Sequence, residues 1–199
     1  MTQPVQGPPP SLIGDKFLVR KKVFKLFGGA FHIYDASGQL ILYSRLKAFK
    51  LKEDIRLYTG EDMQTELLTI HARKILDISS TYDVIDAQTG QRVGALRRKG
   101  LKSLIRDEWV ILGPAEEEIG KIVEDSTALA LIRRFLTALV PQKFHAEVNG
   151  REVFTLAQHF NPFVLKLDLD FSMDRDRILD RRLAFAAAVL MCAIEGRQD

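Results

Sequence analysis

Several features that mark common protein classes are scarce in this 199-residue sequence. It has one cysteine, Cys192, so an intramolecular disulfide is excluded and nothing favours an oxidising compartment. The first residues lack a charged segment followed by an apolar one, which argues against a secretory signal. No apolar run approaches the roughly 20 residues that a membrane-spanning helix requires. These absences predict a cytoplasmic protein without a transmembrane span.

Motifs for catalysis and for metal binding are also missing. The segment GPAEEEIG, residues 113–120, lacks the Lys-Ser or Lys-Thr pair of a phosphate-binding loop. Cys192 lies inside an apolar run, where we expect it to be buried and unreactive. The four histidines are far apart in the sequence, without the short spacing of a zinc site. We therefore assign no catalytic residue and expect the protein not to be an enzyme.

The composition is that of a globular chain. Hydrophobic residues make up 46% and charged residues 28%, which is typical of a protein with a buried core. The N-terminal MTQPVQGPPPSL has few apolar residues and three consecutive prolines, so residues 1–14 are predicted to form a disordered tail. Residues 15–196 then form one domain, and residues 197–199 form a second short tail.

Turn residues between short apolar runs recur along the chain and predict antiparallel strands. Four hairpins are expected, around Ser37-Gly38, Asp86 to Gly90, Gly113-Pro114 and Asn149-Gly150. Asn-Gly is the strongest of these short hairpin signals. Because such signals recur every ten to twenty residues or so, the sequence predicts a mainly β fold, an antiparallel barrel or sandwich.

Two segments depart from this pattern and are predicted to be helices. Apolar residues in Ser126–Val140 recur at helical spacing, with two arginines opposite, so an amphipathic helix is expected in the middle of the chain. The second helix is expected to begin in the acidic stretch at Asp174 and to contain twelve consecutive apolar residues, Leu183–Ile194. Twelve residues reach only about 18 Å, too short for a bilayer. A helix that is apolar on every side must be enclosed by protein, and a sheet wrapped around it would do this.

Two segments and the order of elements carry a resemblance to a known family. RRKGLKSLIRDEWVI, Arg97–Ile111, is similar to a linker between early strands of LURP-one-related proteins, and LDLDFSMD before the apolar helix is similar to the C-terminal region of phospholipid scramblases. The chain thus resembles the tubby-like superfamily, in particular its LURP-one-related and scramblase-like members. The resemblance implies a closed antiparallel β-barrel of about twelve strands with the hydrophobic C-terminal helix threaded through it.

Basic residues occur in three clusters, at 16–25, at 45–52 and at 97–106. The third cluster interleaves its charges with leucine and isoleucine, which suits contact with anionic lipid. The resemblance implies that phosphoinositide headgroups are the ligand. The alternatives are a solvated surface balanced by Asp107 and Glu108, or nucleic acid, which the lack of any recognition motif disfavours. The candidate lipid-binding residues are Arg97, Arg98, Lys99, Lys102 and Arg106.

An acidic group near the C-terminal helix is the best candidate for a metal site, because calcium prefers several carboxylate oxygens. The alternative is a solvated turn that leads into a helix. The resemblance also implies a twelve-residue calcium loop, but AQHFNPFVLKLD lacks side-chain oxygens at most ligand positions. No cofactor is therefore expected, apart from weakly bound calcium. The candidate ligands are Asp168, Asp170, Asp174 and Asp176.

Taken together, these features predict a binding module that is not an enzyme and that meets anionic phospholipid at the periphery of a membrane. Two alternatives remain open at this stage. The first is scramblase-type lipid translocation, and the second is a ligand carrier or a scaffold for protein interaction or transcription. No protein partner follows from the sequence.

Overall fold

The computed structural model describes residues 12–24, 28–46, 54–73, 80–99, 108–125, 141–159 and 164–195. In these ranges it has twelve strands and one helix. The strands are β1 (Lys16–Phe24), β2 (Gly28–Asp35), β3 (Leu40–Leu46), β4 (Asp54–Tyr58), β5 (Glu66–Ala72), β6 (Thr81–Asp86), β7 (Arg92–Arg98), β8 (Glu108–Leu112), β9 (Glu118–Glu124), β10 (Lys143–Val148), β11 (Arg151–Gln158) and β12 (Leu165–Asp170). The helix is α2 (Arg181–Glu195).

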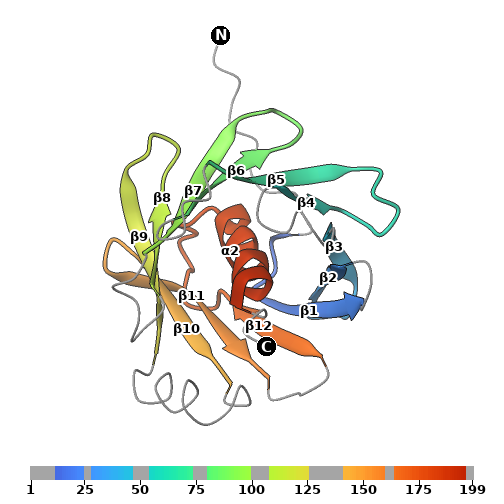
Figure 1. The fold of residues 1–199 in the computed structure, drawn as a ribbon. Coiled ribbons are helices and arrows are strands. Elements are labelled where there is room, and N and C mark those ends of the chain that lie inside the picture. Colours follow the sequence, from blue (N-terminus) through green and yellow to red (C-terminus); the bar gives the residue numbers. More distant parts are fainter. Residues whose placement is uncertain are drawn as a thin grey trace.

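The strands form one closed antiparallel barrel (Figure 1). Each strand pairs with its neighbours in the sequence, and β1 closes the ring by pairing with β12, from Lys16 opposite Asp170 to Lys21 opposite Leu165. Closure leaves every strand with a partner on both sides, so the sheet has no free edge. The predicted closed β-barrel is confirmed.

Short turns join the strands at one end of the barrel, and their residues explain the pairing. Gly38, Gly90 and Asn149-Gly150 have positive φ angles, which glycine and asparagine adopt at low cost. The Asp86 carboxylate accepts hydrogen bonds from the backbone N–H groups of Gln88 and Thr89, both at 2.9 Å. All four predicted hairpins are present, and a fifth joins β4 to β5.

Helix α2 occupies the middle of the barrel (Figure 1). Its side chains from Leu183 to Ala193 are at most 4% exposed and belong to one core cluster with the inward residues of the strands. Gly94 on β7 lets the wall approach the helix, since a Cβ there would lie 3.0 Å from the Leu183 side chain and 2.4 Å from the backbone oxygen of Leu112. The enclosed position predicted for the apolar run is confirmed, and Cys192 is buried as expected.

The helix begins later than the acidic stretch suggested. Residues 171–180 form turns, because the Asp174 carboxylate accepts hydrogen bonds from the backbone N–H groups of Ile178 and Leu179 at 2.9 and 3.3 Å. Asp180 then caps the helix by accepting the N–H of Arg182 at 3.0 Å. The prediction that the helix starts at Asp174 was therefore wrong, because that carboxylate stabilises a turn.

Two consecutive arginines fix the N-terminal end of α2 to the barrel. Arg181, 3% exposed, donates hydrogen bonds to the carbonyl of Gly14 and, at 3.0 Å, to the carboxylate of Asp15. Arg182, 5% exposed, contacts Asp86 at 2.6 Å on the turn between β6 and β7. One arginine thus holds the chain that enters β1, and the other holds the opposite side of the ring.

Some predictions fall partly or wholly on residues that are not described. The predicted helix Ser126–Val140 and residues 1–11 of the predicted tail lie outside the described residues. The buried core includes Leu12, three residues before the predicted domain boundary. Among the described helices, none is both long and apolar enough to cross a membrane.

Candidate functional site

The outer face of the barrel is where this fold presents polar groups to a partner. Inward positions on the strands pack against α2, so the lumen is filled by protein side chains. Because successive strand residues point to opposite faces, the basic residues of one strand divide between the core and the exterior. The position of every candidate residue therefore depends on the register of its strand.

The predicted lipid-binding residues do not form one exterior patch. On β7, Leu96 belongs to the core, so Arg97 faces outward and Arg98 lies on the inner side, in register with buried Trp109. Lys99 follows the strand and contacts Glu108 on β8. Lys102 and Arg106 lie outside the described residues.

The outward basic residues that the structure describes in this region each have an acidic partner. We call the exterior of β7, β8, β9 and β10 the paired wall, defined by three ion pairs. They are Arg97–Glu118, Lys99–Glu108 at 2.6 Å and Lys121–Glu147 at 3.3 Å. Each pair cancels its own charge, so these six residues present no net positive field to an anionic surface.

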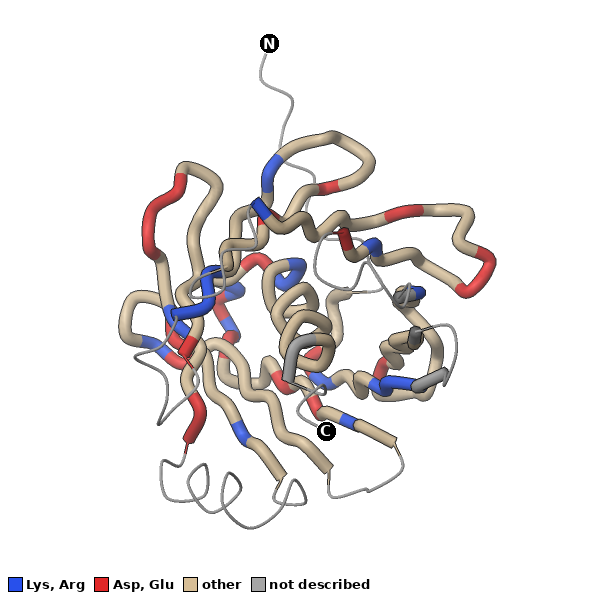
Figure 2. Tube along the Cα trace, in the orientation of Figure 1, with Lys and Arg blue, Asp and Glu red and all other residues tan. Residues whose placement is uncertain are grey.

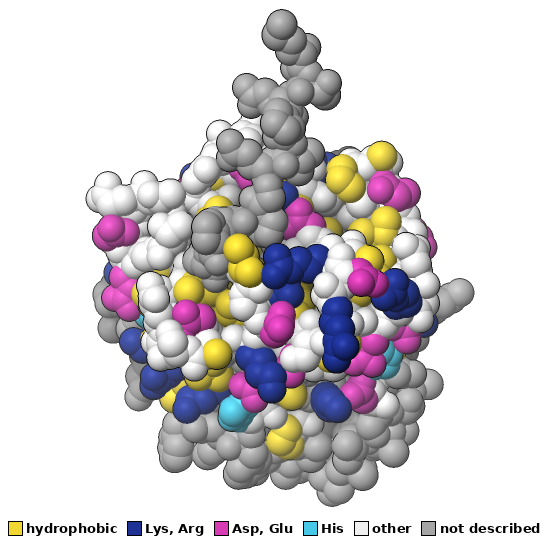
Figure 3. Space-filling model, turned by 180° about the vertical axis from the view of Figure 1, so that it is seen from behind, with side chains coloured by type: hydrophobic (Ala, Val, Ile, Leu, Met, Phe, Trp, Pro, Cys, Tyr) yellow, Lys and Arg dark blue, Asp and Glu magenta, His cyan; other side chains and the backbone are white. Residues whose placement is uncertain are grey.

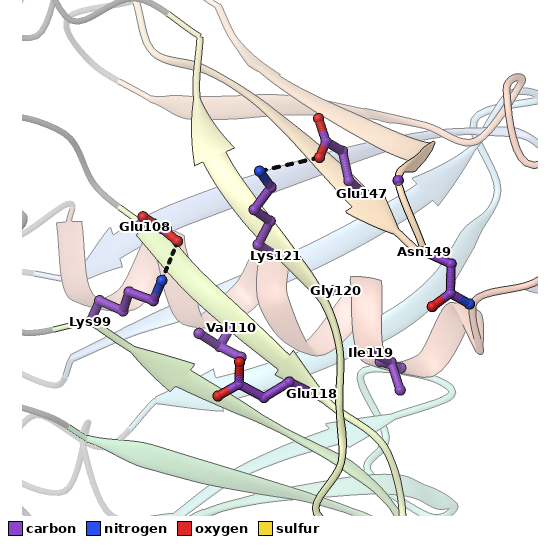
Figure 4. Close-up of a pocket in the computed structure, with 10 residues that line it drawn as sticks. Lys99, Glu108, Val110, Glu118, Ile119, Gly120, Lys121, Glu147 and Asn149 are labelled. Carbon is purple, nitrogen blue, oxygen red and sulfur yellow. Dashed lines mark hydrogen bonds and ion pairs between the residues drawn. The ribbon is translucent and has the colours of Figure 1, made fainter.

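The paired wall contains an open hollow of about 340 Å³ (Figure 4). Val110 and Ile119 contribute its apolar lining, and the pairs Lys99–Glu108 and Lys121–Glu147 lie on its two sides. Charges of both signs around an apolar floor give the hollow no preference for an anion.

Mixed charges also extend beyond the paired wall. Arg73 donates to both carboxylate oxygens of Asp83, at 2.7 and 2.9 Å, and to Glu116 at 2.9 Å, and Arg92 contacts Asp83 and Glu116 as well. The face seen from behind likewise intersperses acidic and basic side chains (Figure 3). These parts of the exterior are unsuited to binding a strongly anionic surface.

The four predicted calcium ligands are separated by their own contacts. Asp168 contacts His159 at 2.7 Å, and Asp170 accepts the hydroxyl of Ser172 at 2.6 Å. Asp174 is 3% exposed and is occupied by the turn described above, and Asp176 forms an ion pair with Arg151 at 2.5 Å. No three His, Cys, Asp or Glu side chains in the described ranges are placed to hold a metal ion. The structure therefore does not bring Asp168, Asp170, Asp174 and Asp176 together as one calcium site.

A second basic region does gather on one face, and its members come from the first two clusters and from β12. On β1 the core residues Phe17 and Val19 point inward, so the alternate residues point outward. The register continues this outer row onto the neighbouring strands β12, β2 and β3. We call the four outward cations of this face the basic strip: Arg20, Lys22, Arg45 and Lys166.

The members of the basic strip are adjacent in the sheet. Arg20 is opposite Lys166 across the β1–β12 seam, and Ala30 on β2 is opposite both Lys22 and Arg45. Lys22 and Arg45 are exposed, and Arg20 and Lys166 are partly exposed. None of the four forms an ion pair with a carboxylate in the described ranges. Figure 2 shows the uninterrupted basic stretch on β1.

His32 on β2 lies within the strip, directly opposite Arg20. It is 3% exposed and its Nε2 is 2.8 Å from the Oε1 of Glu61. Burial lowers the pKa of His32 below its ordinary value of 6.5, the hydrogen bond that its Nε2 donates to Glu61 opposes this, and the charges of Lys22 and Arg20 lower it further. This lowered pKa favours the neutral imidazole, and the buried Nδ1 has no hydrogen-bond partner in the described part of the chain.

Sequence reasoning recognised the first two basic clusters but assigned the lipid site to the third. The clusters differ in how close acidic residues lie to them in the sequence and on the paired strands. Glu108 and Glu118 follow the third cluster closely, whereas 16–25 contains no acidic residue at all. Lys166 carried no sequence signal, because only the closure of β12 against β1 brings it to Arg20.

Comparison with known proteins adds information on the fold. No family model and no curated protein sequence matches the chain. The X-ray structure of the Arabidopsis thaliana protein AT5G01750 is similar, with 12% sequence identity, a TM-score of 0.50, and coverage of 91% of this chain and 92% of that chain. At this identity the similarity shows a shared fold over nearly the whole chain.

Proposed function

We propose that this protein is a binding module without enzymatic activity that docks on anionic phospholipid surfaces through the basic strip. The observation that carries the proposal is the presence of four adjacent outward cations, Arg20, Lys22, Arg45 and Lys166, that have no carboxylate partner in the described ranges. Unpaired charges of one sign on a rigid sheet form a field that attracts a surface of opposite sign. The paired wall has similar cations but lacks this property.

The expected strength follows from the number of charges. A lysine or arginine near an anionic bilayer contributes about 1 kcal/mol, so the strip provides peripheral and reversible binding. Most of that contribution is screened at high salt, because the Debye length falls from about 10 Å at 0.1 M to about 3 Å at 1 M. Binding should therefore be strongest at low ionic strength.

The enclosed helix supports a surface role over a ligand carrier and over lipid translocation. The lumen that a ligand carrier would use is filled by α2, whose residues from Leu183 to Ala193 are buried. Translocation of lipid by this helix would require it to leave the barrel and to expose the apolar inner wall. The enclosed helix also agrees with the resemblance to tubby-like, LURP-one-related and scramblase-like proteins, and we include membership of that superfamily in the proposal.

The proposal is tested by sedimentation of the full chain with vesicles of phosphatidylcholine, with and without phosphatidylglycerol, at low and high salt. We expect binding only to the vesicles that contain phosphatidylglycerol, and loss of that binding at high salt. The variant Lys22→Gln/Arg45→Gln removes two exposed cations and should weaken binding by about 2 kcal/mol, or about 30-fold.

The matched control is Arg97→Gln/Lys99→Gln, which removes the same charge from the paired wall. It should bind the vesicles within about threefold of the wild type, because β7 lies across the ring from β1 and these residues do not face a surface that is docked on the strip. If this control loses binding and the strip variant does not, the third basic cluster is the site and the strip is not. If the wild type ignores anionic vesicles at low salt, the lipid-binding function is wrong.

A further inference from the structure

His32 occupies a special position in the basic strip, because it is a buried titratable group among exposed fixed charges. Arg20 faces it across the β1–β2 pair, and Tyr43 faces it across the β2–β3 pair. The rings of His32 and Tyr43 meet edge to face with centroids 5.1 Å apart, and Tyr34 stacks on the imidazole at 6.2 Å. These contacts hold the imidazole in the sheet, beneath the outward cations.

The charged and titratable groups around His32 come from every neighbouring element. Strand β1 contributes the cations Arg20 and Lys22, and the turn between β4 and β5 contributes the carboxylate of Glu61. The tyrosines on this face are Tyr34, Tyr43 and, in register with Tyr43, Tyr58. Across the strip, Lys166 lies opposite Arg20, and Arg45 lies two residues beyond Tyr43 on β3. Cations therefore outnumber carboxylates around the ring.

We propose that His32 makes docking on an anionic surface dependent on pH, because it takes up a proton when the basic strip binds. This inference rests on the proposed function and names the regulation of the same site. Without a ligand, Arg20 and Lys22 oppose a fifth positive charge. A bound anionic surface neutralises their field, so the imidazolium becomes more favourable and the pKa of His32 rises.

Thermodynamic linkage fixes the direction and the size of the effect. If the bound protein holds one more proton than the free protein, binding strengthens as the pH falls, by at most about tenfold per pH unit. The increase begins as the pH falls through the raised pKa of bound His32, and it ends below the pKa of free His32, which burial lowers from its ordinary value. Tighter docking in mildly acidic conditions is the functional consequence.

The test measures partition onto vesicles of phosphatidylcholine with phosphatidylglycerol, whose phosphodiester stays ionised between about pH 5 and pH 8. Wild-type binding should rise several-fold over this range as the pH falls. In His32→Gln, which keeps a side-chain donor for Glu61 but cannot titrate, the rise should shrink to the background from the other histidines and the carboxylates. His71→Gln, at an exposed position on β5, is the matched control and should keep the wild-type slope.

A second variant tests the inference independently, in case His32→Gln fails to fold. Glu61 has a side chain that is 61% exposed and raises the pKa of His32 through its hydrogen bond and its charge. Glu61→Gln should therefore move the midpoint of the binding increase to lower pH. NMR titration of the His32 imidazole, with and without the vesicles, measures the same shift directly.

The outcomes separate this inference from the proposed function. If the wild type binds at neutral pH and His32→Gln shows the same slope, or if the vesicles leave the pKa of His32 unchanged, proton uptake at His32 is wrong and membrane docking stands. If the wild type fails to bind at any pH at low salt, docking itself is wrong. A pH slope that His71→Gln abolishes instead would assign the proton to His71.

Discussion

The two basic walls of the barrel carry similar numbers of lysines and arginines but differ in the carboxylates beside them. On the paired wall, Glu108, Glu118 and Glu147 each face a cation. Beside the basic strip, Glu61 contacts His32 and Asp168 contacts His159, and neither carboxylate pairs with a cation of the strip. The number of cations in a stretch of sequence therefore does not determine the electrostatic field at the surface. That field depends on whether each cation has a carboxylate partner on the neighbouring strand.

The largest effect is expected from a substitution in α2, the helix against which both walls pack. Ala187 is 2% exposed on α2, inside the barrel. Ala187→Asp would bury a carboxylate without a partner, so we expect the free energy of unfolding to fall by more than about 4 kcal/mol. Chemical denaturation followed by circular dichroism measures this loss. A variant that folds with wild-type stability would show that the helix does not occupy the lumen.

The next effect compares the two arginines that connect α2 to opposite sides of the barrel. Arg182 pairs with Asp86, whose side chain is only 14% exposed, on the side of β6 and β7, whereas Arg181 pairs with Asp15, which is 60% exposed, next to β1. Arg182→Gln removes the cation from a mostly buried carboxylate, which keeps only its backbone hydrogen bonds, and should cost about 3 kcal/mol. Arg181→Gln should cost less, because water can solvate Asp15. Thermal unfolding of the two variants gives the order, and the reverse order would contradict it.

A smaller effect is expected when carboxylates are removed from the paired wall, so that it resembles the basic strip. Glu108→Gln/Glu118→Gln removes two carboxylates at exposed or half-exposed positions and leaves Arg97 and Lys99 without these partners. Binding to phosphatidylglycerol vesicles should then increase, by about 1 kcal/mol for each cation released, up to about 30-fold. Vesicle sedimentation at low salt measures the gain. Unchanged binding would mean that local charge pairing does not explain the difference between the walls.

The sequence predicted those parts of the fold that depend on residues close together in the chain. Turn residues such as Gly90 and Asn149-Gly150 marked the hairpins, and the apolar run Leu183–Ile194 marked the enclosed helix. Strands β1 and β12 were not recognised, because lysine, arginine and aspartate occupy their outward positions and hide the alternation of Phe17 and Val19. Their pairing closes the barrel, so closure followed only from the family resemblance.

The candidate site was harder to predict, because it depends on register. A shift of one residue would exchange the inward Lys21, whose Nζ donates to the carbonyl of Cys192 at 3.0 Å, with the outward Arg20. Likewise, nothing local to Arg97 and Arg98 indicates that one faces out and the other in. Partners that are distant in the sequence, such as Lys166 beside Arg20, are visible only when the strands are paired.

The pairing of β1 with β12 also determines when this chain can fold during its synthesis. The first strand has no second neighbour until residues 165–170 have left the ribosome, and the apolar wall has nothing to enclose until α2 follows them. Completion of the ring must therefore wait for β12, and contacts between residues so distant in sequence form slowly. Until then the nascent hairpins expose inward apolar side chains, so we expect the chain to depend on chaperones while it is being made.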